Sequence, residues 1–284
     1  MAGFFGLFDY TKEGPGVSKN EKKKKGFFHF FEVYFRNFWS YAKVGPLYWL
    51  CSLLVATNGM AKVGLTHVAR STQKEKHSFL YSDFFESIKK NWKQALILGV
   101  INVVAMILLA FDIWYFWNYL NYKVSFFGLL GLAIAFLFLV CTTFMKYYIW
   151  TLLITFNLKV KQLIKNSFNF VFLNLWRNIL ISVTMGIIYV GLAILSMINA
   201  YLMMVAAAIM LFVVPGFKAA LIQANAFPAI QKYMIDPYYA EHKGEDIEKR
   251  LALGLNVSDE ELALVTPTEE SIFSDNSDKT GEKE

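Results

Sequence analysis

Three features of this chain could bind a metal ion, supply a nucleophile or bind a phosphate group. They are the histidines, the cysteines and a glycine-rich segment. The histidines lack the HExxH spacing of a zinc-binding helix, and the spacing of the cysteines fits neither a metal site nor a disulfide framework. No GxxxxGK[ST] phosphate loop is present, and Gly14-Pro15-Gly16 is better explained as a turn. The sequence therefore predicts no catalytic residue, no cofactor and no metal ligand. The side chains concerned are His29, His67, His77, His242, Cys51 and Cys141.

Ionisable side chains inside apolar runs are the other source of chemistry, because a charge within a bilayer is costly and usually functional. Asp112 lies about 27 Å along its helix from the cytoplasmic end, near the outer surface. Lys146 is about 33 Å beyond the start of its run, so its ammonium group can snorkel to the cytoplasmic face, and Lys218 is expected at the inner interface. A membrane enzyme or ion-coupled carrier is therefore not supported. The polar residues within the runs, expected to form interhelical hydrogen bonds, are Asn102, Thr142, Thr143, Ser182 and Thr184.

Composition indicates the setting that these residues share. Of the 284 residues 56% are apolar and 18% are charged, and the mean hydropathy is +0.39, which with the long apolar runs indicates an integral membrane protein of all-α class. Residues 1–240 carry 23 basic and 9 acidic side chains, whereas residues 241–284 carry 5 basic and 13 acidic ones. Basic charge beside apolar runs is typical of cytoplasmic loops over an anionic leaflet, and nucleic acid is not an expected partner.

Run lengths predict four firm transmembrane helices and one ambiguous segment. A fifth apolar stretch, 37–57, is interrupted by Lys43 and Gly45-Pro46, and the residues from Thr57 onward should end the helix before them. We expect this first segment to be a short, broken or re-entrant element or, alternatively, a full crossing of the membrane. The apolar segments are about 37–57, 94–118, 124–145, 178–196 and 200–217, with 124–145 continuing as a cytoplasmic helix and a turn around Asn199.

Basic residues then predict orientation. Segment 58–93 holds seven Lys and Arg residues and segment 159–177 holds four, whereas loop 118–123 holds one and turn 197–200 none. The basic segments, and with them the C-terminus, are therefore expected in the cytoplasm. The outer loops are too small to capture an extracellular ligand. The five lysines of 19–25 also favour a cytoplasmic N-terminus, which conflicts with a full crossing at 37–57.

A repeated aromatic pattern precedes three of the apolar segments. Its members are spaced by four, which places each trio on one stripe of a helix. The pattern predicts amphipathic helices along the cytoplasmic surface that turn into the bilayer where a Trp ring lies at headgroup depth. The alternative to a repeat is that ordinary interfacial Trp residues share this spacing by coincidence. A shift of 84 residues also aligns Lys62 with Lys146. The trios are Phe31–Phe35–Trp39, Phe84–Ile88–Trp92 and Phe168–Phe172–Trp176.

Three regions follow from these patterns. Residues 1–25 form a basic N-terminal segment at the cytoplasmic surface, 26–235 the membrane domain, and 236–284 an acidic, partly disordered tail. Asp236-Pro237 is expected to close the preceding helix. The candidate membrane-interface or partner-contact residues are Trp39, Trp92, Trp176, Lys62, Lys146 and Lys218.

Several stretches share a pattern: MAGFFGLFDY with GPGVSKNE, FFEVYFRNFW, Thr57-x-Gly59-x-Ala61, Gly64-Leu65-Thr66 with Arg70, and SDFFESIKKNWKQ. Through these stretches, residues 1–235 resemble the YesL-like family of bacterial membrane proteins. The family usually has Thr-Ile-Gly-Pro-Ala near residue 57, where this chain has Asn58 and Met60 in place of the Ile and Pro. The resemblance implies no activity, but members in Gram-positive bacteria are typically encoded beside carbohydrate ABC importers and glycoside hydrolases.

We therefore expect an accessory, non-enzymatic subunit of a carbohydrate ABC importer in the bacterial plasma membrane. Its expected partners are the lipid bilayer and the permease or ATPase subunits. A homo-oligomeric channel or transporter is one alternative, and it needs polar groups along a shared pathway. A membrane assembly or signalling factor that uses the acidic tail is another.

Overall fold

In the computed structural model of this chain, the described residues are 27–54, 57–74, 79–241 and 247. They form helices and no strand, which confirms the all-α prediction. In chain order the helices are α1 Phe27–Arg36, α2 Phe38–Ser52, α3 Asn58–Gln73, α4 Leu80–Tyr122, α5 Phe126–Thr155, α6 Val160–Leu173, α7 Leu175–Ile198, α8 Ala200–Phe212, α9 Val214–Ile230, the π-helix η2 Gln231–Ile235 and α10 Asp236–Glu241.

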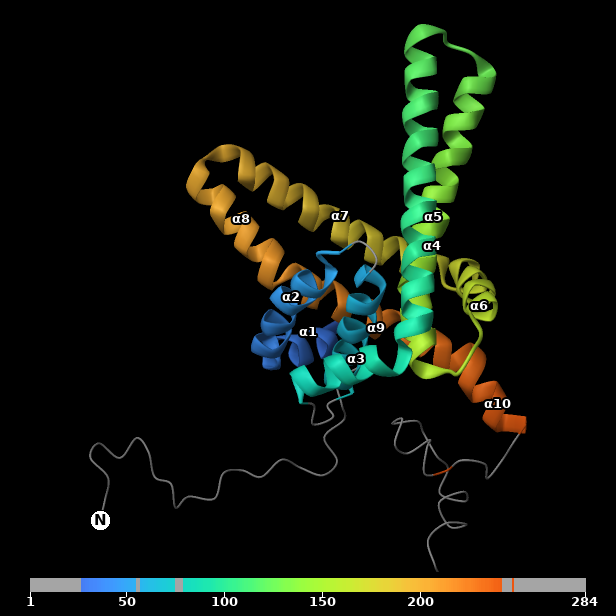
Figure 1. The fold of residues 1–284 in the computed structure, drawn as a ribbon. Coiled ribbons are helices and arrows are strands. Elements are labelled where there is room, and N and C mark those ends of the chain that lie inside the picture. Colours follow the sequence, from blue (N-terminus) through green and yellow to red (C-terminus); the bar gives the residue numbers. More distant parts are fainter. Residues whose placement is uncertain (1–26, 55–56, 75–78, 242–246, 248–284) are drawn as a thin grey trace, which may run out of the picture.

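Two helical hairpins project from a compact base, as Figure 1 shows. The α4–α5 hairpin rises on one side, the α7–α8 hairpin leans away from it, and α1, α2, α3 and α9 gather below. Both hairpin turns carry a side-chain cap. The Ser125 hydroxyl accepts a hydrogen bond from the Gly128 amide at 3.1 Å, and the Asn199 side chain accepts one from the Leu202 amide at 2.9 Å. The predicted turn at Asn199 is confirmed.

Three helices, α4, α5 and α7, are long and apolar enough to cross a membrane. Helices α8 and α9 give a fourth crossing if the pair, bent by 44°, is counted as one span. The span prediction is thus confirmed for three helices, and the fourth is a bent pair rather than one straight helix. Helix α5 continues past Lys146 to Thr155, as expected, and α4, which contains the apolar segment 94–118, begins at Leu80.

The first apolar segment forms the short helix α2. Its 15 residues cover about 22 Å, less than the hydrocarbon core of about 30 Å. The interruption of the apolar segment at Pro46 does not break the helix, because α2 continues through that residue. The expected end is confirmed: α2 stops at Ser52, and the Thr57 hydroxyl donates to the carbonyl oxygens of Cys51 at 2.6 Å and Leu54 at 2.9 Å.

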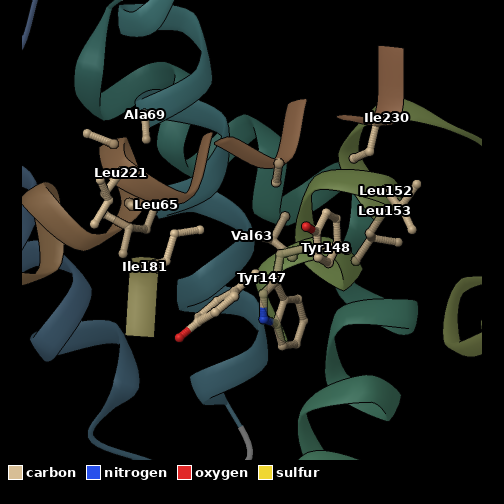
Figure 2. Packing of buried hydrophobic residues seen from close by; sticks show 14 of the residues in the cluster. Val63, Leu65, Ala69, Tyr147, Tyr148, Leu152, Leu153, Ile181, Leu221 and Ile230 are labelled. Atoms are coloured by element: carbon tan, nitrogen blue, oxygen red, sulfur yellow. The ribbon is translucent and has the colours of Figure 1, made fainter. Parts of the chain in front are cut away.

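Helix α3 forms the centre of the base. Helices α1, α2, α4, α5 and α9 all pack against it, and ten of its 16 residues are buried. Figure 2 shows Val63 and Leu65 of α3 among side chains from α5, α7 and α9, including Tyr148 and Leu221. The backbones approach closely because Gly59 lies directly against the Ala95 carbonyl group of α4. A segment expected to be a basic cytoplasmic connection therefore contains the helix around which the base packs.

The aromatic trios do not all lie on single helices. Asn37 separates α1 from α2, and Asn174 separates α6 from α7. Each break falls between the second and third members of a trio, so Trp39 and Trp176 belong to the next helix and the single-stripe prediction is wrong there. The remaining trio, Phe84–Ile88–Trp92, stays within α4. The first turns of this helix run across the base before the helix rises (Figure 1).

The polar residues within the spans behave in two ways. Ser182 makes the expected interhelical hydrogen bond, 2.8 Å from the Tyr147 hydroxyl of α5. Thr142, Thr143 and Thr184 instead donate to carbonyl groups of their own helices. A hydroxyl that can reach the carbonyl group of the preceding turn needs no partner on another helix.

At the C-terminal end, the helix does not stop at Asp236-Pro237 as expected. It continues through η2 into α10, which ends at Glu241. Pro237 is the second residue of α10, which follows the π-helix directly. The predictions for 1–25 and for nearly all of the acidic tail fall outside the described residues.

Candidate functional site

Three of the six candidate residues meet in one cavity. Lys62 of α3, Lys146 of α5 and Lys218 of α9 all line a space of about 420 Å³, which we call the lysine cavity. The sequence names each lysine separately as an interface residue, and the fold brings them together because α5 and α9 both pack against α3. Among the described residues that line this cavity, none is acidic.

Each lysine rests on a soft, electron-rich group. The Lys62 ammonium lies 5.6 Å from the centre of the Trp150 ring, and the Lys218 ammonium lies 5.9 Å from that of Tyr189. The Lys146 ammonium is 3.0 Å from the Met106 sulfur atom of α4. Aromatic faces and a thioether partly compensate a cation but carry no full negative charge. The positive charge of the three groups is therefore not neutralised by these contacts.

Aromatic and polar side chains complete the walls. Trp49 of α2 is fixed by a hydrogen bond from its indole nitrogen to the Met210 carbonyl oxygen at 3.3 Å. The Gln223 amide nitrogen donates to the Thr151 hydroxyl at 2.7 Å, while the Gln223 amide oxygen is buried without a partner among the described residues. The other polar or aromatic residues of the wall are Tyr48, Thr66, Thr143, Tyr147, Trp150 and Tyr189.

Burial makes the charge of Lys62 sensitive to pH. Desolvation, followed by repulsion from Lys146 and Lys218, lowers the pKa of the Lys62 ammonium to about 8. Lys62 lies on α3, which is not one of the candidate spans. An anion in the cavity would favour the charged form of Lys62 and raise this pKa again. The cavity is thus suited to binding a negatively charged group.

A hydrogen-bond network behind the cavity joins α5, α6 and α7. The buried Tyr148 hydroxyl donates to the Asn178 side-chain oxygen at 2.6 Å and accepts from the Asn174 amide nitrogen at 2.9 Å. The Asn178 amide nitrogen reaches the carbonyl oxygens of Phe170 and Val171 at 3.4 and 3.3 Å. This network holds the α6–α7 break against the helix that carries Lys146.

A second cavity lies on the other side of α9 and shares Gln223 with the first. It has a volume of about 640 Å³ and is lined by Arg70, Lys74 and Arg177 among others. Arg70 donates to the Thr155 hydroxyl at 2.6 Å, and its guanidinium group lies 4.5 Å from the Phe227 ring centre. Burial lowers the pKa of Arg70 to about 10, so this side chain remains charged at neutral pH.

The three tryptophans named from the sequence lie elsewhere. Trp39 and Trp176 are 76% and 77% exposed and Trp92 is 48% exposed. Their exposure fits contact with lipid or with another protein, and their role stays a prediction. Trp176 lines the second cavity, and none of the three lines the lysine cavity.

Sequence reasoning missed the aromatic walls of the lysine cavity. One signal was present on α5, where Thr143, Tyr147 and Trp150 share a stripe with Lys146 at helical spacing. Tyr48, Trp49 and Tyr189 come from other helices and had no such signal. No group of three or more His, Cys, Asp or Glu side chains that could hold a metal ion occurs within the described part of the chain.

Comparison with known proteins places part of the chain in context. Residues 41–113 match a family described as "Protein of unknown function, DUF624". The match covers α3, most of α2 and the first three-quarters of α4, so it includes Lys62 but neither Lys146 nor Lys218. No curated protein and no solved structure matches the chain.

Proposed function

We propose that the chain is an accessory membrane subunit of a carbohydrate ABC importer and performs no chemical step itself. It would lie in the bacterial plasma membrane with its C-terminus in the cytoplasm, beside the permease or ATPase subunits. The exposed surface of the spans carries this proposal, and the resemblance to the YesL-like family supplies the importer.

The spans bury little of their surface within the chain. In the most apolar stretches of α4, α5 and α7, only 17%, 11% and 11% of the residues are buried. Apolar helices with so little internal contact require lipid or other membrane helices around them. A self-contained carrier would instead pack its spans around a central substrate site. The two splayed hairpins therefore favour a subunit over an independent transporter.

Helix α7 offers the surface best suited to a neighbouring helix. Around Gly186 there is open space within 4 Å of where a Cβ atom would lie, and the same holds for Gly191. Small residues at exposed positions of a membrane helix allow another helix to approach closely. The adjacent Ile187 is 68% exposed. Ile187 lies one turn before Gly191 on the same stripe of the helix, so the face of α7 that carries these two residues is the proposed contact with the partner.

Site-specific photo-crosslinking in native membranes tests this proposal. A benzophenone amino acid replaces Ile187 on α7 in one variant, and Ile107 on α4, 62% exposed, in the matched control. We expect the Ile187 variant to form an adduct with an importer permease or ATPase subunit, identified by mass spectrometry. The Ile107 variant is expected to form adducts mainly with lipid.

Other adducts would decide against this function. An adduct of the Ile187 variant with a second copy of the chain would favour the homo-oligomeric channel or transporter, which ion or sugar flux through proteoliposomes would then test. Adducts with lipid alone at both positions would contradict any stable subunit role.

A further inference from the structure

The lysine cavity brings three positively charged side chains together. Lys62, Lys146 and Lys218 come from three different helices, and each is held among aromatic or apolar side chains. Like charges in a region of low dielectric constant repel one another strongly. Three ammonium groups around one cavity therefore lower the stability of the fold unless an anion binds there. Charged groups held in such an unfavourable arrangement are a common sign of a functional site.

The depth of the cavity indicates where that anion comes from. Lys146 stands 20 residues after the start of α5 at Phe126, or about 30 Å along the helix. Lys218 stands 19 residues after the turn at Asn199, or at most about 28 Å. The hydrocarbon core of a bilayer is about 30 Å thick. If the hairpin turns lie at one face of the membrane, the cavity lies close to the phosphate groups of the opposite leaflet.

We propose that Lys62, Lys146 and Lys218 bind a phosphate group that enters the cavity at the level of the lipid headgroups. Lysine is a frequent phosphate ligand, because its compact charge can approach a phosphate oxygen from many directions. Three ammonium groups can each meet a different oxygen. The unpartnered amide oxygen of Gln223 can accept a hydrogen bond from a hydroxyl group of the ligand. The proposal does not depend on the importer role.

The phosphate could belong to an anionic lipid or to a free phosphate ion, and separate addition of each distinguishes the two. The full chain is purified in dodecyl maltoside, a detergent that contains no phosphate, in phosphate-free buffer, and either phosphatidylglycerol or inorganic phosphate is then added. The thermal unfolding midpoint is measured, and native mass spectrometry detects bound lipid. A rise with phosphatidylglycerol identifies a lipid phosphate, and an equal rise with inorganic phosphate alone identifies the free ion.

Substitution by methionine separates binding from folding. Lys62→Met, Lys146→Met and Lys218→Met keep the length of the side chain and remove the charge. In the maltoside detergent without phosphate each should raise the unfolding midpoint, because repulsion is relieved. Each should also weaken phosphate binding by about tenfold or more, the effect of one lost charge-assisted hydrogen bond. Lys90→Met removes an exposed lysine at the start of α4 and should leave phosphate binding unchanged.

Two results would overturn the proposal. One is the absence of stabilisation by both phosphatidylglycerol and inorganic phosphate, or its full retention in the three cavity variants. The other is a lower midpoint for all three variants in the maltoside detergent without phosphate, since the lysines would then stabilise the fold through their contacts with Trp150, Met106 and Tyr189. Equal weakening by Lys90→Met would show that general surface charge attracts the lipid, and it would also count against the cavity.

Discussion

The base and the hairpins of this protein differ in which types of residue they bury and which they expose. The base surrounds α3, a helix of small, polar and basic residues that is mostly buried. The hairpins consist of large apolar residues that are mostly exposed, such as Ile107 and Ile187. In a water-soluble protein the apolar helices would be inside. Here burial and hydropathy are uncoupled, because the solvent around the hairpins is expected to be lipid.

This difference locates both stability and function. Apolar side chains gain little from association within lipid, so the hairpins hold together by close packing and short turns. The base gains from specific contacts, including the Tyr148 network and the approach of Gly59 to α4. It also contains the lysine cavity. Substitutions in the base should therefore be more damaging than equal substitutions in the hairpins.

The largest effect is expected for Gly59→Ala. A Cβ atom at this position would collide with the Ala95 carbonyl oxygen, and two helix backbones cannot move apart as easily as a side chain can. We expect a loss of about 3 kcal/mol or more in the free energy of unfolding. The matched change Gly186→Ala meets open space and should gain up to about 1 kcal/mol from helix propensity. Unfolding in detergent micelles measures both, and equal losses would remove the distinction between base and hairpin.

A smaller loss is expected for Tyr148→Phe. The hydroxyl is buried and bonds to both Asn174 and Asn178, so its removal leaves the buried Asn178 side-chain oxygen without its donor, at a cost of about 1–3 kcal/mol. Tyr115→Phe on α4, where Tyr115 is 50% exposed, should change stability by less than about 0.5 kcal/mol. Denaturation of the two variants side by side checks the order, and a reversed order would contradict it.

The response of the lysine cavity to pH sharpens the comparison further. Lys62 binds phosphate only when protonated, and its pKa is lowered to about 8. Stabilisation by phosphatidylglycerol should therefore be full near neutral pH and decrease as the pH rises above about 8. The phosphodiester does not titrate in this range. The groups that face Lys62 are Lys146 on α5, Lys218 on α9, and the phenols of Tyr48, Tyr147 and Tyr189, which are neutral at pH 8.

The control for this prediction is Lys62→Met, in which the remaining stabilisation should change less over the same pH range. Thermal unfolding of the wild-type chain and the variant at several pH values makes the comparison. Stabilisation that grows with rising pH would contradict the assignment of Lys62 as a phosphate ligand.

The smallest effect is expected at the hairpin turns. Ser125→Ala and Asn199→Ala each remove a side-chain cap, which typically costs about 1 kcal/mol. The exposed Ser196 hydroxyl donates to the Ala193 carbonyl oxygen of its own helix and caps no backbone amide among the described residues, so Ser196→Ala should be neutral. Losses at the caps that exceed the loss in Tyr148→Phe would show that the turns, and not the base, determine stability.

Hydropathy predicts the hairpins because contact with lipid demands apolar residues along whole helices. The same reasoning misses α3, since a helix buried among other helices can use Gly, Ala and Thr and so has a low overall hydropathy. Lys62 and Arg70 therefore look like loop charges in the sequence. The breaks at Asn37 and Asn174 are also invisible, because the aromatic spacing continues across them.

The lysine cavity could be predicted only in part. Each lysine is recognisable as an unusual charge beside an apolar run, and the 84-residue shift aligns two of them. Their convergence depends on how α5 and α9 pack on α3. That packing is set by contacts between residues far apart in the chain, such as Gln223 with Thr151, which no local pattern encodes.

Quenching of single tryptophans by brominated lipid tests the central claim, that lipid covers the hairpins and protein covers the base. Trp114 on α4 is 61% exposed, whereas Trp150 at the lysine cavity is 5% exposed. In variants that retain one tryptophan, with the others replaced by Phe, the account predicts strong quenching of Trp114 and little quenching of Trp150. Equal quenching of the two, or quenching of Trp114 by aqueous iodide instead, would contradict it.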